Sequence, residues 1–190
     1  ELVNNTSLYD GTSEIASAPM NAAATEKTKQ LYQFLQQNYG QKIVTGQYVS
    51  DSSGKELDEI YNITGKYPLI RFADMNAYSP NGGDETKATA VADSLAWAEE
   101  GGVVGLSWLW NVPTGTASFY EKDTSFDLKT AVTDADVAGK SEEELSKMVS
   151  NGEITQNCYA LISDIDHISE ALKPLADADV PVLWRPLPEA

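Results

Sequence analysis

Two periodicities alternate along the chain, and together they predict helices and strands in strict succession. The segments with helical spacing of apolar residues are 22–39, 53–65, 84–101 and 155–176. Short apolar runs, bounded by turn-forming or acidic residues, predict strands at 42–48, 67–74, 102–110 and 180–184. The order is therefore one helix, then strand and helix three times, then a last strand. The prolines at 186 and 188 are expected to end that strand at Trp184.

Nearly continuous apolar strands separated by helices indicate an α/β fold with a parallel sheet covered by helices. The segment Asn81-Gly82-Gly83-Asp84 follows a strand but lacks the glycine spacing of a dinucleotide-binding loop. With 190 residues, the chain is shorter than the ~250 residues of a typical eight-fold barrel. We therefore expect about the first four strand–helix units of a (β/α)8 TIM barrel.

Two stretches fall outside this succession. Residues 1–20 are aperiodic and rich in small polar residues, which predicts an N-terminal surface arm ahead of a barrel domain at 21–190. Residues 111–154 form a long excursion between a strand and a helix. Within it, Ser141 and Glu144 have the spacing of a capping box, which predicts one small helix.

Polar and aromatic side chains stand at the end of every predicted strand. They are Gln47 and Tyr48 on the first, Asp74 and Asn76 on the second with Tyr78 just after, Trp108, Trp110 and Asn111 on the third, and Arg185 and Glu189 on the fourth. Carboxyl ends of parallel strands share one face of a barrel, so these groups should converge. Indole rings stack on the C–H faces of sugars, while amides and carboxylates bind hydroxyl groups. This convergence predicts a carbohydrate site.

Each of these residues also has a structural interpretation. Trp108 and Trp110, two residues apart on a strand, should face the same side of the sheet, either as sugar-binding rings or as core residues. Asp74 can cap the turn that follows it, and Arg185 can be an ion-pair partner. Only the convergence of four strand ends favours the functional interpretation.

Charge and composition narrow the possible partners. The net charge of −16 is unfavourable for binding phosphate backbones, so we expect no nucleic-acid partner, and it suits a protein that acts on a neutral polymer. No apolar stretch approaches the ~20 residues that span a bilayer, so no membrane partner is expected. With Cys158 and His167 each the only residue of its type, and no calcium-loop spacing among the aspartates, we expect no disulfide, metal or cofactor.

Several stretches resemble glycoside hydrolase family 26, whose best-known members are secreted β-1,4-mannanases. The similar stretches are residues 43–47, Trp108-Leu109-Trp110-Asn111-Val112-Pro113, Phe119-Tyr120 and Pro181 to Glu189. The resemblance covers the chain from about residue 22 onward. It implies a (β/α)8 barrel, retaining hydrolysis of a mannan-type plant polysaccharide by an endo-acting enzyme, and an extracellular location.

The same resemblance implies roles for single residues. Glu189 would be the general acid/base, Arg185 would order the site, and Trp110 would line the cleft with Phe119 nearby. The nucleophilic glutamate of the family comes from a later strand, so the chain alone is expected to be inactive without the C-terminal half of the barrel, from the same protein or a second chain.

The chain departs from the family pattern at two positions. Leu109 and Pro188 stand where the family usually has histidine. Two alternatives therefore stay open, namely a family member acting on mixed-linkage β-glucan or xylan, and a catalytically impaired carbohydrate-binding protein.

Overall fold

The computed structural model describes residues 16–81, 83–113, 121–186 and 188, and the chain divides into two compact units, 1–45 and 46–190. In the first unit, helix α1 (Glu26–Asn38) begins after Thr25, whose side chain accepts a hydrogen bond from the Thr28 N–H. The Tyr32 hydroxyl donates to the Ala16 carbonyl. Most of the predicted N-terminal arm, residues 1–15, lies outside the described residues.

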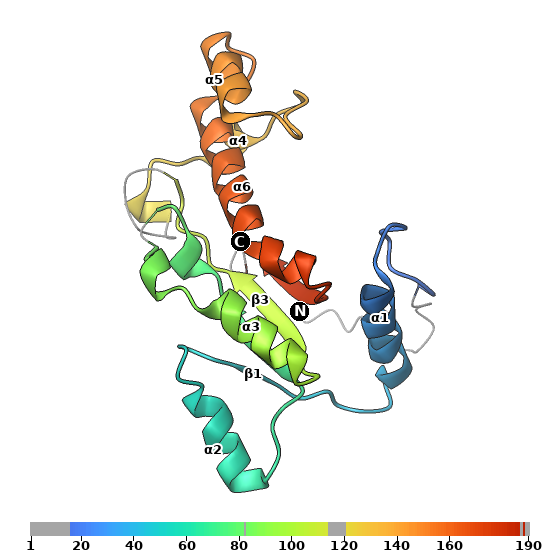
Figure 1. The fold of residues 1–190 in the computed structure, drawn as a ribbon. Helices are drawn as coiled ribbons and strands as arrows, with labels where there is room; N and C mark the ends of the chain where they lie inside the picture. Colours follow the sequence, from blue (N-terminus) through green and yellow to red (C-terminus); the bar gives the residue numbers. More distant parts are fainter. Residues whose placement is uncertain (1–15, 82, 114–120, 187, 189–190) are drawn as a thin grey trace, which may run out of the picture. The chain divides into compact units, whose positions relative to one another are not determined.

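The second unit contains one parallel sheet whose strands lie in chain order (Figure 1). The strands are β1 (Gly46–Tyr48), β2 (Ile70–Asp74), β3 (Val103–Trp108) and β4 (Val182–Pro186). The helices are α2 (Lys55–Thr64), α3 (Ala90–Glu99), α4 (Leu128–Ala131), α5 (Glu142–Ser150) and α6 (Gln156–Asp177), with three-residue 3-10 helices η2 (Asn76–Tyr78), η3 (Glu85–Lys87) and η4 (Glu121–Asp123). The predicted parallel α/β arrangement is confirmed.

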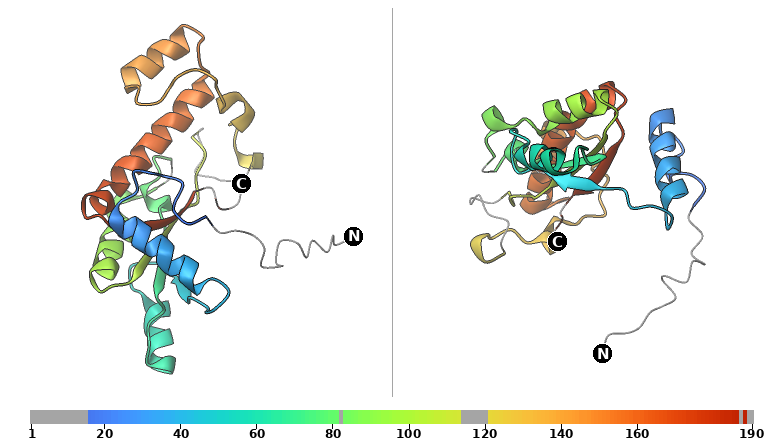
Figure 2. Two further views of the ribbon diagram at one scale, coloured as in Figure 1. Left: turned by 90° about the vertical axis from the view of Figure 1, so that its right-hand side faces the viewer. Right: turned by 90° about the horizontal axis from the view of Figure 1, so that it is seen from below.

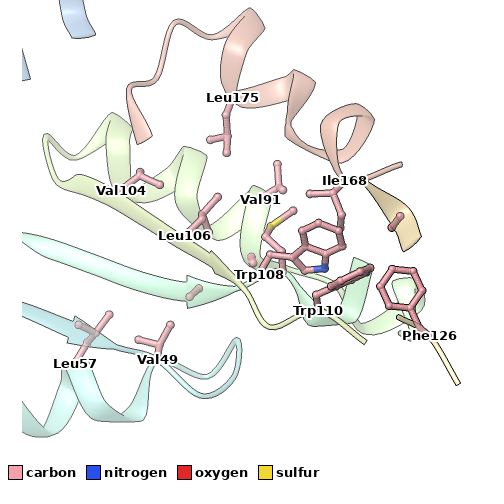
Figure 3. Close-up of a cluster of buried hydrophobic side chains, with 14 residues drawn as sticks. Val49, Leu57, Val91, Val104, Leu106, Trp108, Trp110, Phe126, Ile168 and Leu175 are labelled. Atoms are coloured by element: carbon pink, nitrogen blue, oxygen red, sulfur yellow. The ribbon is translucent and has the colours of Figure 1, made fainter. Parts of the chain in front are cut away.

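One face of this sheet is covered by α3 and α6. Alternate residues of β3, namely Val104, Leu106 and Trp108, project toward these helices and are buried (Figure 3). They pack in one core with Val91 of α3 and Leu175 of α6. Fully burying an apolar side chain of this size stabilises the fold by about 1.5–3 kcal/mol. This layer therefore determines which face of the sheet packs against the helices.

The opposite face, which we call the open face, is formed by the residues that alternate with these along each strand. Gly105 of β3 pairs with Phe72 of β2, and the Phe72 ring lies directly against it. A Cβ atom at position 105 would stand 2.0 Å from Phe72 Cδ2. The absence of a side chain at Gly105 therefore leaves room for the Phe72 ring. A methyl group at position 105 would overlap with the ring and disrupt this contact.

The predicted small helix in the 111–154 excursion corresponds to α5. Ser141 and Glu144 form the expected capping box at its start. α5 packs on the beginning of the long helix α6 through a small core of Leu145, Ile154 and Cys158 (Figure 2). Cys158 is a free, buried thiol, as its apolar neighbours in the sequence suggest. The excursion also contains α4 and η4, which the sequence analysis did not predict.

Several boundaries differ from the sequence prediction, among them the end of β3, which stops at Trp108 and leaves Trp110 beyond the strand. β1 begins only at Gly46, after an almost fully exposed Ile43. The helix predicted from residue 84 starts at Ala90, because the Asp84 side chain accepts a hydrogen bond from the Thr86 N–H and starts η3 instead. β4 continues through Pro186, which pairs with Trp108. Because β4 is the outermost strand of the described sheet, a residue without an N–H group is tolerated there.

Candidate functional site

The carboxyl ends of the four strands bring polar side chains together on the open face. The register pairs Tyr48 with Phe72, Asp74 with Ser107, and Ser107 with Arg185. Because alternate residues share a face, Tyr48, Asp74, Ser107 and Arg185 lie on the side of the sheet away from α3 and α6. The structure thus brings Asp74 and Arg185 to one edge, as convergence of the strand ends required.

Asp74 organises this edge through three donors. Its Oδ2 accepts a hydrogen bond of 2.5 Å from Ser107 Oγ, and its Oδ1 accepts one of 2.7 Å from the Asn76 N–H. The Leu109 N–H is 3.2 and 3.3 Å from the two carboxylate oxygens. The carboxylate therefore ties β2 to β3 and fixes the segments that follow both strands, which includes the turn-capping role that the sequence left open.

Tyr48 contributes an aromatic ring and a hydroxyl group. Its ring stacks on Phe72 with centroids 6.4 Å apart, and it is about half exposed. Burial of the hydroxyl, followed by the charge of Asp74, raises the pKa of Tyr48, so the phenol is a hydrogen-bond donor at neutral pH. A half-exposed ring beside donors and acceptors is the chemistry that binds a sugar ring.

Arg185 fixes the chain just beyond β4. Its Nη2 donates a hydrogen bond of 3.0 Å to the Pro188 carbonyl. The guanidinium thereby holds the turn that leads to position 189. Glu189 itself lies outside the described residues, as does Phe119, so the roles expected for both stay predictions.

Gln47 and Asn111 make contacts within the protein. Gln47 pairs with Arg71, whose guanidinium contacts Asp93 of α3, so Gln47 is on the helix side of the sheet. Its Nε2 donates 2.6 Å to the Tyr48 carbonyl. Asn111 is buried, and its Nδ2 donates 2.8 Å to the Asn81 carbonyl. The Asn111 contact joins the segments that follow β3 and β2, and substrate contact by either Gln47 or Asn111 stays a prediction.

Trp108 and Trp110 lie close together, with ring centroids 5.9 Å apart, as their spacing predicts. Both are on the helix side of the sheet and only 4% and 7% exposed (Figure 3). Trp108 Nε1 donates to Ser79 Oγ, and the Trp110 ring meets Phe126 edge-on. This packing favours the core interpretation that the sequence left open, and a sugar-binding role for either ring stays a prediction.

A buried carboxylate on α6 connects these strand-end loops to the helix layer. Asp164 Oδ2 accepts a hydrogen bond of 2.8 Å from Trp110 Nε1, and its two oxygens lie 3.4 and 3.3 Å from Asn81 Nδ2. Burial raises the pKa of Asp164, although Trp110, Asn81 and the positive charge of His167 oppose that shift. The segments after β2 and β3 are therefore both fastened to α6.

This raised pKa predicts a pH-dependent difference between the wild type and Asp164→Asn. Above 3.8, the ordinary aspartate value, the unfolded carboxyl is ionised while the folded one retains its proton. The folded state then binds more protons, so the free energy of unfolding falls as pH rises until the raised pKa is passed. In urea unfolding of the full-length protein from pH 3.8 upward, the stability of the wild type should therefore fall relative to that of Asp164→Asn as the pH rises.

Asp166 provides the matched control, because it is exposed on the same helix. Asp166→Asn should leave the pH dependence of the wild type unchanged. Parallel curves for wild type and Asp164→Asn across the same pH range would contradict the assignment.

A cavity of about 450 Å³ opens beside the carboxyl ends of β1 and β2. Tyr48, Arg71, Asp74, Tyr78 and Lys87 are among the residues that line it. Its volume lies within the ~300–1,000 Å³ that small-ligand pockets occupy.

In the described part of the chain, no cluster of three or more acidic, histidine or cysteine side chains is arranged to bind a metal ion. Across the same residues, no helix has both the length and the apolar character to cross a bilayer.

Sequence reasoning placed Tyr48 among the strand-end groups suited to a sugar site, but it did not select Ser107. The signal was available for Ser107, because it is the one hydroxyl residue inside an otherwise apolar strand and alternates with Leu106 and Trp108. The position of Tyr48 opposite Phe72 depends on strand register, which the sequence does not specify.

The sequence of the chain is similar to a known protein family and to proteins of known activity. Residues 20–190 match the family model described as "Glycosyl hydrolase family 26". A mannan endo-1,4-beta-mannosidase of Thermothelomyces thermophilus is 36% identical over 90% of this chain and 33% of its own length. Mannan endo-1,4-beta-mannosidase A of a Piromyces species is 31% identical over 95% of this chain and 28% of its own length. The chain thus spans about a third of the length of these curated relatives.

The fold of the chain is also similar to solved structures of mannanases. A β-(1,4)-mannanase of Podospora anserina superposes with a TM-score of 0.71 at 32% identity, covering 91% of this chain and 36% of that one. A β-mannanase from a symbiotic protist of the termite Reticulitermes speratus, solved with a gluco-manno-oligosaccharide, gives a TM-score of 0.69 at 26% identity, covering 92% and 52%.

Proposed function

Because the chain belongs to glycosyl hydrolase family 26, we propose that the protein carrying it is an endo-acting β-1,4-mannanase. The family members with solved structures are (β/α)8 barrels, and the described strands and helices are about the first four units of such a barrel. The observation that carries the proposal is the 36% identity to a mannan endo-1,4-beta-mannosidase across 90% of the chain.

Retaining hydrolysis requires two carboxyl groups about 5–5.5 Å apart, one protonated and one ionised. We assign Glu189 as the proton donor, which gives its proton to the leaving glycosidic oxygen and then activates water. Arg185 supports this assignment, because it binds the carbonyl of the residue just before Glu189. The ionised nucleophile would come from a later strand, in the C-terminal half of the barrel.

The open face would supply substrate binding. Tyr48 on the open face offers a ring and a donor, while Asp74 and Ser107 keep the strand ends in register. The net charge of −16 suits a neutral hemicellulose of the mannan type. We further propose that the protein is secreted, because a polymer of this size is degraded outside the cell, and that its reaction needs no cofactor.

A substrate panel tests this proposal. The full-length protein is incubated with mannan, lichenan and xylan, and release of reducing ends is measured alongside the sizes of the products. Mannan should be cut internally into mixed oligosaccharides. Faster turnover of lichenan or xylan would indicate a family member with another substrate, and binding without turnover of any polymer would indicate the catalytically impaired alternative.

A further inference from the structure

Three aromatic side chains form a platform at the amino end of β2, which is the opposite end of that strand from Asp74. We define the platform as Tyr61 on the last turn of α2, Tyr67 in the segment before β2, and Trp97 on α3. The Tyr61 and Tyr67 rings are stacked, with centroids 4.6 Å apart and planes 22° apart. Trp97 meets Tyr67 edge-on at 6.1 Å.

The platform is exposed although its base is fixed. Tyr61 and Tyr67 are 46% and 50% exposed, whereas aromatic residues are mostly buried. Trp97 Nε1 donates 3.2 Å to the Leu69 carbonyl, and its ring fills the space beside Gly102, where a Cβ would stand 2.1 Å from that nitrogen. A rigid indole thus supports Tyr67, and Tyr67 supports Tyr61. The outer rings are held ready at little entropic cost.

Charge at the platform favours a neutral ligand. The exposed charged residues near its rings in sequence are Asp58 and Glu59 on α2, Lys66 beside Tyr67, and Glu99 and Glu100 at the end of α3, so four carboxylates stand against one cation. Carboxylates accept hydrogen bonds from hydroxyls and repel acidic polymers. Exposed rings whose sequence neighbours are mostly acidic therefore suit a neutral sugar, whose C–H face stacks and whose hydroxyls donate. Protein partners usually need ~800 Å² on each side, far more than two half-exposed tyrosines offer.

We propose that the platform is a secondary binding site for a neutral polysaccharide. It holds a length of polymer at the amino end of β2, while the strand-end site lies at the carboxyl end, about 15 Å further along a strand rising ~3.3 Å per residue. This inference rests on the proposed function for the identity of the polymer. The platform takes no part in bond cleavage, and its effect is to keep the enzyme on an insoluble substrate.

Binding is measured with the full-length protein carrying Glu189→Gln, so that no polymer is degraded. Adsorption isotherms on insoluble mannan, xylan and cellulose should show that Tyr61→Ala and Tyr67→Ala each weaken binding to the preferred polymer by about 3- to 10-fold. Tyr61→Phe and Tyr67→Phe keep the rings and should bind as the parent. Tyr39→Ala is the matched control, because Tyr39 is 67% exposed and makes no ring contact with any other described residue.

A second measurement separates this proposal from the proposed function. With Glu189 intact, Tyr61→Ala should hydrolyse soluble manno-oligosaccharides at the parental kcat/KM and insoluble mannan several-fold more slowly. If no polymer is cut, the proposed function fails, and the isotherms still test the platform. Parental binding of all three polymers by folded Tyr61→Ala and Tyr67→Ala would overturn the platform site. So would sedimentation data in which these substitutions dissociate a dimer, since the rings would then bind protein.

Discussion

Replacing Glu189 with alanine is expected to slow hydrolysis of β-1,4-mannan by the full-length protein by about 10²- to 10⁴-fold. A sugar alkoxide is a poor leaving group, so cleavage of the glycosidic bond depends on the proton that this carboxyl supplies. The measurement is the initial rate of reducing-end release from mannan. Because Arg185 binds the Pro188 carbonyl, the turn before position 189 should keep its conformation in the variant.

Two further substrates identify the step that is lost. An aryl mannoside with an acidic leaving group needs little protonation, so its first step should be much less affected by Glu189→Ala. Added azide should then restore turnover by attacking the glycosyl-enzyme without a general base. Glu99→Ala is the control, since Glu99 is an exposed glutamate at the end of α3. Wild-type rates on mannan for Glu189→Ala would refute the assignment.

Replacing Asp74 with alanine is expected to destabilise the protein by about 3 kcal/mol or more. The change leaves the Ser107 hydroxyl and the N–H groups of Asn76 and Leu109 without their acceptor. Each buried donor without a partner costs about 1–3 kcal/mol, and these three lie in a part-buried region. The free energy of unfolding is measured by urea titration, with near-ultraviolet circular dichroism to report packing around the tryptophans.

Asp74→Asn keeps one acceptor oxygen and should cost less than the alanine variant. Asp166→Ala removes an exposed aspartate of α6 and should change stability by about 0.5 kcal/mol or less. Equal stability of Asp74→Ala and Asp166→Ala would show that the carboxylate does not hold the strand ends. Activity on mannan should fall with Asp74→Ala, because Tyr48 and Ser107 lose the group that orders their edge of the sheet.

The order and direction of the strands follow from local patterns. Apolar runs between helical segments are enough to indicate a parallel sheet, and parallel strands necessarily place Asp74 and Arg185 at one edge. The ends of elements are less predictable, because they depend on competing contacts. The Asp84 side chain accepts a hydrogen bond from the Thr86 N–H, and α3 begins only at Ala90. The Leu109 N–H donates to the Asp74 side chain and not to a neighbouring strand.

The orientation of the tryptophans shows where local reasoning stops. A spacing of two residues predicts that Trp108 and Trp110 face the same way, but it does not say which way, and β3 ends at Trp108 so that Trp110 follows the strand. That choice depends on contacts with distant residues, such as Asp164, which is 54 positions from Trp110 in the sequence. Strand register has the same origin, which is why the sequence does not place Tyr48 opposite Phe72.

The main chain of Leu109 is anchored at both polar groups, with its N–H on Asp74 and its carbonyl accepting 2.7 Å from Asn76 Nδ2. A position anchored in this way can exchange its side chain without disturbing the loop. Natural variation or laboratory selection therefore has freedom here, and saturation mutagenesis at 109 should yield folded proteins whose preference among polymers differs. The backbone contacts thus make this point of the domain a place where a new specificity can arise while the loop keeps its conformation.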